Sequence, residues 1–275
     1  MPHIRKAAVA GSWYPGTAAA AADAVDRHLA RADASIAGDL VALIAPHAGL
    51  MYSGPVAAYA YQLLRERAFD VAVLVGPSHF VGFDGAAVYD SGGFETPLGV
   101  ASIDAACAAD LTRNSRIVRA NAAPHAREHS LEMQLPFLQR LAPALPIVPI
   151  LMGYQEADTA RDLGDALAGA LAGRRALLIA STDLSHYHDA RTAKAMDRVV
   201  MDCVTSFDAD GLQHALDRDP GHACGGGPTV AVMRAARALG ATDAVVLNYA
   251  DSGDVSGDKS SVVGYMAAAL GRFSP

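Results

Sequence analysis

Several features that would assign this chain to a familiar class are scarce in its 275 residues. Aromatic residues make up 6% and charged residues 19%, whereas 52% are hydrophobic. No apolar run reaches the roughly 20 residues that cross a bilayer. A turn-forming stretch at 11–16 interrupts the region where a signal peptide would need its apolar core. We therefore expect a cytoplasmic protein that does not enter a membrane.

Charge and cysteine content exclude further classes. The chain has 22 Lys and Arg against 29 Asp and Glu, a net charge of -7, and no basic stretch. Neither nucleic acid nor an anionic membrane surface is therefore an expected partner. Its three cysteines, Cys107, Cys203 and Cys224, are too few and too scattered for a disulfide framework. The glycines at 225–227 lack the spacing of a P-loop or a dinucleotide fingerprint, so we predict no bound nucleotide.

Short apolar runs alternate with helical patterns along most of the chain. The expected strands cover 41–45, 71–75, 147–152, 176–180, 244–249 and 261–266. The expected helices cover 17–32, 54–67, 104–113, 130–141, 157–172, 190–207, 208–216 and 225–239. Such alternation is typical of βαβ units around a parallel sheet that helices cover on both faces.

The stretch from 86 to 102 breaks this alternation. Its short pieces at 86–88, 94–98 and 100–103 predict a local antiparallel excursion. No repeat, low-complexity tract or linker divides the chain. We therefore predict one α/β domain over 1–275, with a mostly parallel central sheet and helices on both faces.

Three of the expected strands run directly into loops that carry a histidine: His47, His79 and His186. Parallel strands place their carboxyl ends at one edge of the sheet, which is where open α/β sheets bind ligands. A single histidine in such a loop is more often a packing or surface residue. Three of them, each flanked by turn residues, indicate a functional site, because histidine is the commonest metal ligand and the usual acid or base near neutral pH.

Two other groups of polar residues belong to the same analysis. Cys224 precedes glycines that should begin a helix, and a helix N-terminus stabilises a thiolate. We prefer a functional role for it and a place in the core for the other two cysteines. The polar segment 124–132 contains Glu128 and His129. It does not fit the HExxH zinc pattern, and a supporting role around the site is as well founded as a purely structural one.

The order of short motifs along nearly the whole chain resembles the Memo-like family, also called AmmeMemoRadiSam system protein B. The matching segments are AVAGSWYP at 8–15, APHAG at 45–49, YSG at 52–54, GPSH at 76–79, ETPLG at 95–99, EHSLE at 128–132, STDLSHY at 181–187, CG at 224–225, NYADSGD at 248–254 and SVVGY at 261–265. Each segment is short, but together and in this order they are highly specific.

The resemblance implies a fold similar to that of class III extradiol dioxygenases, which hold non-haem Fe(II) and open aromatic rings. His47 and His79 would stand where those enzymes keep their two metal-binding histidines. Cys224 would replace their glutamate ligand. His186 would match their acid/base histidine, and Asp183 would orient the site or contact the metal's waters.

The cysteine departs from the dioxygenase pattern and bears on the metal. A thiolate is a softer ligand than a carboxylate and favours Zn, Cu(I) or a different iron chemistry. Together with the resemblance to iron-dependent dioxygenases, the ligand set implies a divalent or redox metal, iron first, then copper or zinc. Trp13, Tyr52 and Asp251 are expected on the substrate side or around the ligands. The family association also implies a radical S-adenosylmethionine protein and an Amme-type protein as partners.

Four functions fit these residues. The first is a redox metalloprotein that acts on a small-molecule or peptide ligand, with His186 moving protons. The second is a zinc hydrolase with His186 or Glu128 as base. The third is a peptide- or ligand-binding module that keeps an oxygenase-like pocket without chemistry. The fourth and weakest is a cysteine-nucleophile enzyme that pairs Cys224 with His186 or His222.

Overall fold

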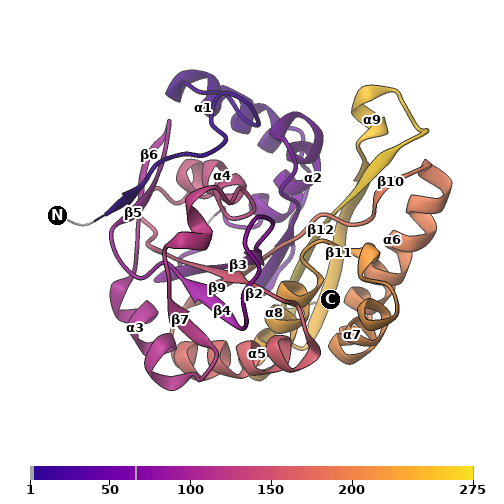
Figure 1. Ribbon diagram of the computed structural model, residues 1–275. Coiled ribbons are helices and arrows are strands. Elements are labelled where there is room, and N and C mark those ends of the chain that lie inside the picture. The colour runs from indigo at the N-terminus through magenta and orange to yellow at the C-terminus, as the bar shows by residue number, and fades with distance from the viewer. Residues whose placement is uncertain (1–2, 66, 275) are drawn as a thin grey trace.

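A nine-stranded mixed sheet forms the centre of the molecule (Figure 1). The computed structural model describes residues 3–65 and 67–274. Along the sheet the strand order is β10-β12-β2-β9-β3-β8-β4-β7, and β11 pairs with β12. Its middle consists of four parallel strands, β2 (Gly38–Ala45), β9 (Ala176–Ser181), β3 (Val71–Pro77) and β8 (Ile147–Met152).

The flanks of the sheet are largely antiparallel. On one side, β12 (Val262–Phe273) pairs antiparallel with β2, β11 (Asp243–Asp251) and β10 (His186–His188). On the other side, β4 (Ala86–Val88) runs antiparallel to β8 and parallel to β7 (Val118–Ala120). The last strand is longer than the predicted 261–266, because residues 267–271 remain buried and the pairing with β2 continues to Phe273.

A separate three-stranded sheet explains the irregular stretch after β4. It contains β1 (Ile4–Arg5), β5 (Gly93–Thr96) and β6 (Gly99–Ser102). The hairpin of β5 and β6 is the predicted antiparallel excursion, whereas β4 joins the main sheet. The N-terminal segment is thereby tied to the body of the protein through β1, which pairs with β5.

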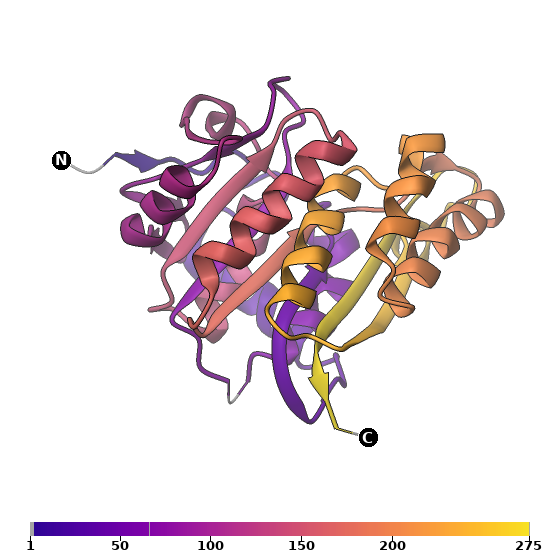
Figure 2. The same cartoon turned by 90° about the horizontal axis from the view of Figure 1, so that it is seen from below.

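Helices cover both faces of the main sheet, as predicted. Successive strand residues point to opposite faces, so Ile44 packs in one core and Leu43 in the other. One face carries α1 (Ala18–Leu29), α2 (Leu50–Gln62) and α4 (Leu135–Leu141). The other carries α3 (Ala105–Asn114), α5 (Ala157–Leu171), α6 (Ala190–Thr205), α7 (Ala209–Arg218) and α8 (Gly226–Ala238). Figure 2 shows α5 and α8 lying side by side across this second face.

Two helices differ most from the sequence prediction. Helix α2 covers Leu50–Gln62 instead of 54–67 and contains Pro55 in its second turn, and the Leu50 N–H at its start donates to the Trp13 carbonyl at 2.8 Å. The predicted helix at 130–141 divides into a 3-10 turn and α4. Pro136 lies in the first turn of α4, where a proline removes no helical hydrogen bond.

In the described part of the chain, no helix is both long and apolar enough to span a membrane. The remaining helix, α9 (Gly253–Ser256), is a single turn between β11 and β12.

Candidate metal centre

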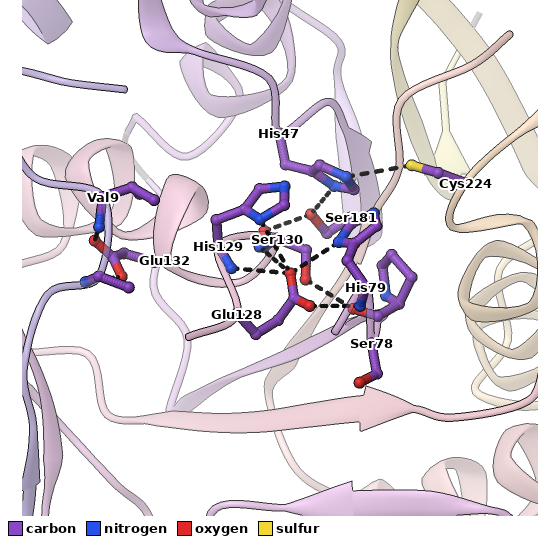
Figure 3. Close-up of polar contacts among 12 residues, drawn as sticks. Val9, His47, Ser78, His79, Glu128, His129, Ser130, Glu132, Ser181 and Cys224 are labelled. Atoms are coloured by element: carbon purple, nitrogen blue, oxygen red, sulfur yellow. Dashed lines mark hydrogen bonds and ion pairs between the residues drawn. The ribbon is translucent and has the colours of Figure 1, made fainter. Parts of the chain in front are cut away.

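The carboxyl ends of the central strands bring His47, His79 and Cys224 together (Figure 3). One donor atom from each lies within 4.8 Å of the other two. His47 follows β2 and is 2% exposed, and His79 follows β3 with a side chain that is 27% exposed. The loops after β2 and β3 therefore meet at one edge of the sheet, whereas His186 of the third predicted loop is not part of this group.

Cys224 reaches this edge from the loop before α8. Its backbone N–H donates to the Asp183 carbonyl at 3.2 Å, and the Asp183 N–H lies 3.3 Å from the Cys224 sulfur. Gly225 follows directly, and a Cβ there would collide with the Ser181 carbonyl and with Thr182. The glycine that follows Cys224 thus has a packing role, because it allows the loop that contains Cys224 to lie close to the end of β9.

The hydrogen bonds around His47 fix which of its ring nitrogens is free. Its Nδ1 lies 2.9 Å from Ser181 Oγ. The Ser181 hydroxyl has a single proton, which it donates to the Ser130 carbonyl at 2.7 Å. It must therefore accept from His47 Nδ1–H, so His47 Nε2 carries the free lone pair. That nitrogen lies 3.2 Å from the Cys224 sulfur.

Glu128 fixes the second imidazole in the same way. Its Oε1 lies 2.9 Å from His79 Nδ1, and its Oε2 accepts from the His79 backbone N–H at 2.6 Å. Burial opposes ionisation of Glu128, but the hydrogen bonds and charge of His79 prevail and lower its pKa to about 2. The ionised carboxylate accepts the Nδ1 proton, so Nε2 is the ring nitrogen left to face a metal. Carboxylate or hydroxyl support of the distal nitrogen is typical of metal-binding histidines.

Burial keeps both His47 and the Cys224 thiol in their neutral forms. Burial, followed by the neighbouring His79 and His129, lowers the pKa of His47, so this ring is neutral. Burial also raises the pKa of the Cys224 thiol, with Asp183 adding to the effect. A metal ion would reverse the second effect, because the thiolate is the binding form, and its uptake would release a proton.

Asp183 is buried beside the loop that carries His47. Its Oδ1 accepts the backbone N–H groups of His47 and Ala48 at 2.7 and 3.3 Å. Burial raises its pKa to about 7 despite these two hydrogen bonds. The contacts assign Asp183 to holding the His47 loop, which agrees with the orienting half of its predicted role.

His129 and Trp13 form the wall beside the two histidines. The His129 ring stacks on His79 with centroids 4.6 Å apart and meets His47 edge-on at 5.6 Å. Trp13 also packs against His129, with ring centroids 4.3 Å apart. His79, Glu128 and His129 also form a possible metal-binding group. The oxygens of Glu128 are already occupied by hydrogen bonds, so the group with Cys224 is the better ligand set.

Of the remaining predicted residues, some lie near the candidate metal centre and others lie away from it. His186 lies in β10, where Nδ1 is 2.8 Å from the Leu184 carbonyl, so that nitrogen carries the proton and Nε2 is free. Burial lowers the pKa of His186, and the ring lies close enough to His47 to influence the pKa of that residue. Tyr52 lines a cavity together with Trp13. Asp251 is instead engaged in a local ion pair with Lys259 at 2.7 Å in the turn between β11 and α9.

Sequence reasoning missed the residues that hold the ligands in place. Ser181 orients His47, and Gln134 donates to Ser181 Oγ at 2.7 Å and to the Pro46 carbonyl at 3.1 Å. Ser181 stands in one of the family motifs, but nothing in the sequence marks its hydroxyl as the partner of His47. The sequence carries no comparable signal for Gln134.

Fold and site together define an α/β protein with a candidate His/His/Cys metal-binding group at the carboxyl edge of its parallel strands. The model of the Memo-like protein family matches residues 5–269, and the chain belongs to this family. A MEMO1 family protein from Methanothermobacter thermautotrophicus is 40% identical, with 95% of this chain and 98% of that protein covered. One from Nitrosopumilus maritimus is 35% identical, with 96% and 98% covered.

A solved structure confirms the fold at greater distance. The crystal structure of an uncharacterized protein from Escherichia coli has a TM-score of 0.54 to this chain at 16% sequence identity. The match covers 83% of this chain and 99% of that one. At this identity the likeness concerns the fold alone.

Proposed function

We propose that this protein binds a transition metal through His47, His79 and Cys224, with iron the first choice and copper after it, and that it acts in redox chemistry on a small molecule. Zinc, which has no redox chemistry, belongs to the hydrolase alternative. The observation that carries the proposal is the shared orientation of the two imidazoles. Each has its distal nitrogen held by a buried acceptor, so each presents Nε2 toward the same space as the cysteine sulfur.

Three protein ligands suit a metal that must also meet a substrate. Two histidines and one anionic ligand leave positions open on iron, and the thiolate makes the set softer than its dioxygenase counterpart. When bound, the metal would supply redox chemistry at those open positions. In this proposal His186 moves a proton through its free Nε2, and Asp183 keeps the His47 loop in place.

The geometry weakens two of the alternatives. Glu128 is a poor general base for a zinc hydrolase, because its carboxylate is committed to His79 and has a pKa of about 2. A cysteine nucleophile paired with His186 or His222 is also unsupported. Among the described residues, neither of these two rings hydrogen-bonds to the Cys224 sulfur. The ring nitrogen next to the Cys224 sulfur belongs to His47.

Elemental analysis of protein purified without a metal-binding tag tests the proposal. Wild type would be compared with the His47→Ala/His79→Ala double variant and with His214→Ala, an exposed histidine on α7. We expect close to one iron or copper per chain in wild type and in His214→Ala, and loss in the double variant. Stoichiometric zinc would instead favour the zinc-hydrolase alternative. No metal in any protein after anaerobic reconstitution would leave a binding module as the better account.

A further inference from the structure

A cavity of about 750 Å³ lies beside the metal centre, between α1 and the start of α2. Trp13 lines this cavity and also packs against His129 at 4.3 Å. The indole is therefore a wall shared by the cavity and the candidate metal centre. Gly49, which begins α2 two residues after His47, lines the cavity as well.

Much of the cavity wall is apolar and exposed to solvent. Trp13 is 38% exposed and Met51 is 60% exposed, and both lie in this concave region with Leu50 and Tyr52. Large apolar side chains in a concave site of this size are characteristic of surfaces that a small molecule covers. The body of the ligand should accordingly be apolar and flat enough to lie against an indole.

Positive charge is concentrated on the α1 side of the same cavity. Arg27 and Arg31 both line it and are four residues apart, so they share one face of the helix. Neither guanidinium has a carboxylate within ion-pair distance among residues 3–65 and 67–274, whereas Arg140 nearby pairs with Asp26 of α1 at 2.7 Å. In a chain with a net charge of -7, two unpaired cations at an apolar cavity select for an anion.

We propose that this cavity binds a small organic carboxylate with an aromatic or aliphatic body. The body lies against Trp13 and Tyr52, and the carboxylate faces Arg27 and Arg31, whose planar guanidinium groups match a carboxylate in two-point hydrogen bonding. Binding itself does not require the metal. The further step, that this ligand is the substrate and meets the metal past Trp13, rests on the proposed function.

A pair of dyes that differ mainly in charge tests the site. Anilinonaphthalene sulfonate is an anion with an apolar body, and N-phenyl-1-naphthylamine is its uncharged counterpart. Trp13 is the single tryptophan of the chain, so energy transfer from tryptophan to a bound dye reports binding at this wall. We expect saturable binding of the anionic dye with energy transfer, and competition by 3-phenylpropionate but not by 3-phenylpropanol or inorganic phosphate.

Charge variants make the test specific. Arg27→Gln/Arg31→Gln should weaken the anionic dye about tenfold, as expected for two solvent-facing ion pairs, and leave the neutral dye unchanged. Arg116→Gln/Arg191→Gln removes the same charge from exposed positions elsewhere and should bind both dyes as wild type does. The proposal would be overturned if both double variants weakened binding of the anionic dye equally, or if neither variant changed it. It would also be overturned if the bound dye showed no energy transfer from tryptophan.

Metal content separates this inference from the proposed function. The Arg27→Gln/Arg31→Gln variant should keep the metal content of wild type. A metal-free wild type that still binds the anionic dye would sink the proposed function and leave the carboxylate site standing. A metal-loaded wild type that fails to bind 3-phenylpropionate would sink only the carboxylate site.

Discussion

Glu128 supports His79 through a buried carboxylate, and Glu128→Gln removes its charge while keeping its size. Oε1 accepts from His79 Nδ1 at 2.9 Å and from the backbone N–H groups of His129 and Ser130 at 2.9 and 2.8 Å. Oε2 accepts from the His79 N–H at 2.6 Å. A glutamine has one acceptor oxygen. If that oxygen takes the Oε1 position, its amide nitrogen opposes the His79 N–H, and the reverse orientation loses the three hydrogen bonds that Oε1 accepts.

The expected cost follows from this count. Losing the supporting carboxylate of a metal-binding histidine typically lowers metal affinity about 10- to 100-fold, which corresponds to roughly 1.4 to 2.7 kcal/mol. The metal-free protein should also lose about 1.5 to 3 kcal/mol of unfolding free energy, because one buried donor is left facing another. Glu95→Gln is the matched control, since Glu95 pairs with Lys6 at the surface.

Cobalt(II) titration in competition with a chelator measures the affinity, because a sulfur-to-cobalt charge-transfer band reports that Cys224 is a ligand. Denaturant unfolding of the metal-free proteins measures stability. The reasoning fails if Glu128→Gln binds cobalt as tightly as wild type while His79→Ala has lost it. Equal losses in Glu128→Gln and Glu95→Gln would also refute it, since the effect would then be one of net charge.

Three further predictions concern groups around the centre. Burial lowers the pKa of His125 to about 4, so its contribution to stability is complete above pH 6.5 and is lost as the pH falls toward 4. At pH 5 the loss of unfolding free energy is about 2 kcal/mol. If the urea midpoint of His125→Gln fell with decreasing pH as steeply as that of wild type, the prediction would be contradicted. Tyr187 has a left-handed backbone with φ 64 and is 77% exposed. Tyr187→Gly should therefore raise the unfolding free energy by about 0.5 to 1 kcal/mol and leave the metal content unchanged. A clear decrease in the unfolding free energy would argue against backbone strain at this position. Glu132→Gln breaks a buried ion pair with Arg5 at 2.6 Å. It should lower the unfolding free energy by about 3 kcal/mol and red-shift the Trp13 fluorescence. An unshifted spectrum would show that the position of Trp13 does not depend on this ion pair.

The meeting of His47 and His79 was predictable because the strands before them are continuous apolar runs. Such runs read as buried parallel strands, and parallel strands bring their following loops to one edge. The loop containing Cys224 was a weaker prediction, based on the glycines that follow it. The structure supplies the missing reason, since a side chain at Gly225 would collide with the end of β9.

The support of the ligands was not predictable from the same patterns. Ser181 lies 134 residues from His47 along the chain, and their contact depends on the register in which Ala45 of β2 stands beside Ser181 of β9. Hydrophobic periodicity shows that two strands are buried, but it does not specify their neighbours or their register. The antiparallel edge formed by β12 was missed for the same reason.

The two sides of the site differ in how the fold holds them. His47 and His79 follow central strands directly and are locked by Ser181 and Glu128, so the ligand geometry depends on the sheet. Trp13 stands instead on the N-terminal segment, where Glu132 accepts the N–H groups of residues 8 and 9 and the Tyr14 hydroxyl. Substitutions at 11–15 should therefore alter which molecule enters the cavity while leaving the three metal ligands in place. In this arrangement, ligand selection and metal binding are separately adjustable within one fold.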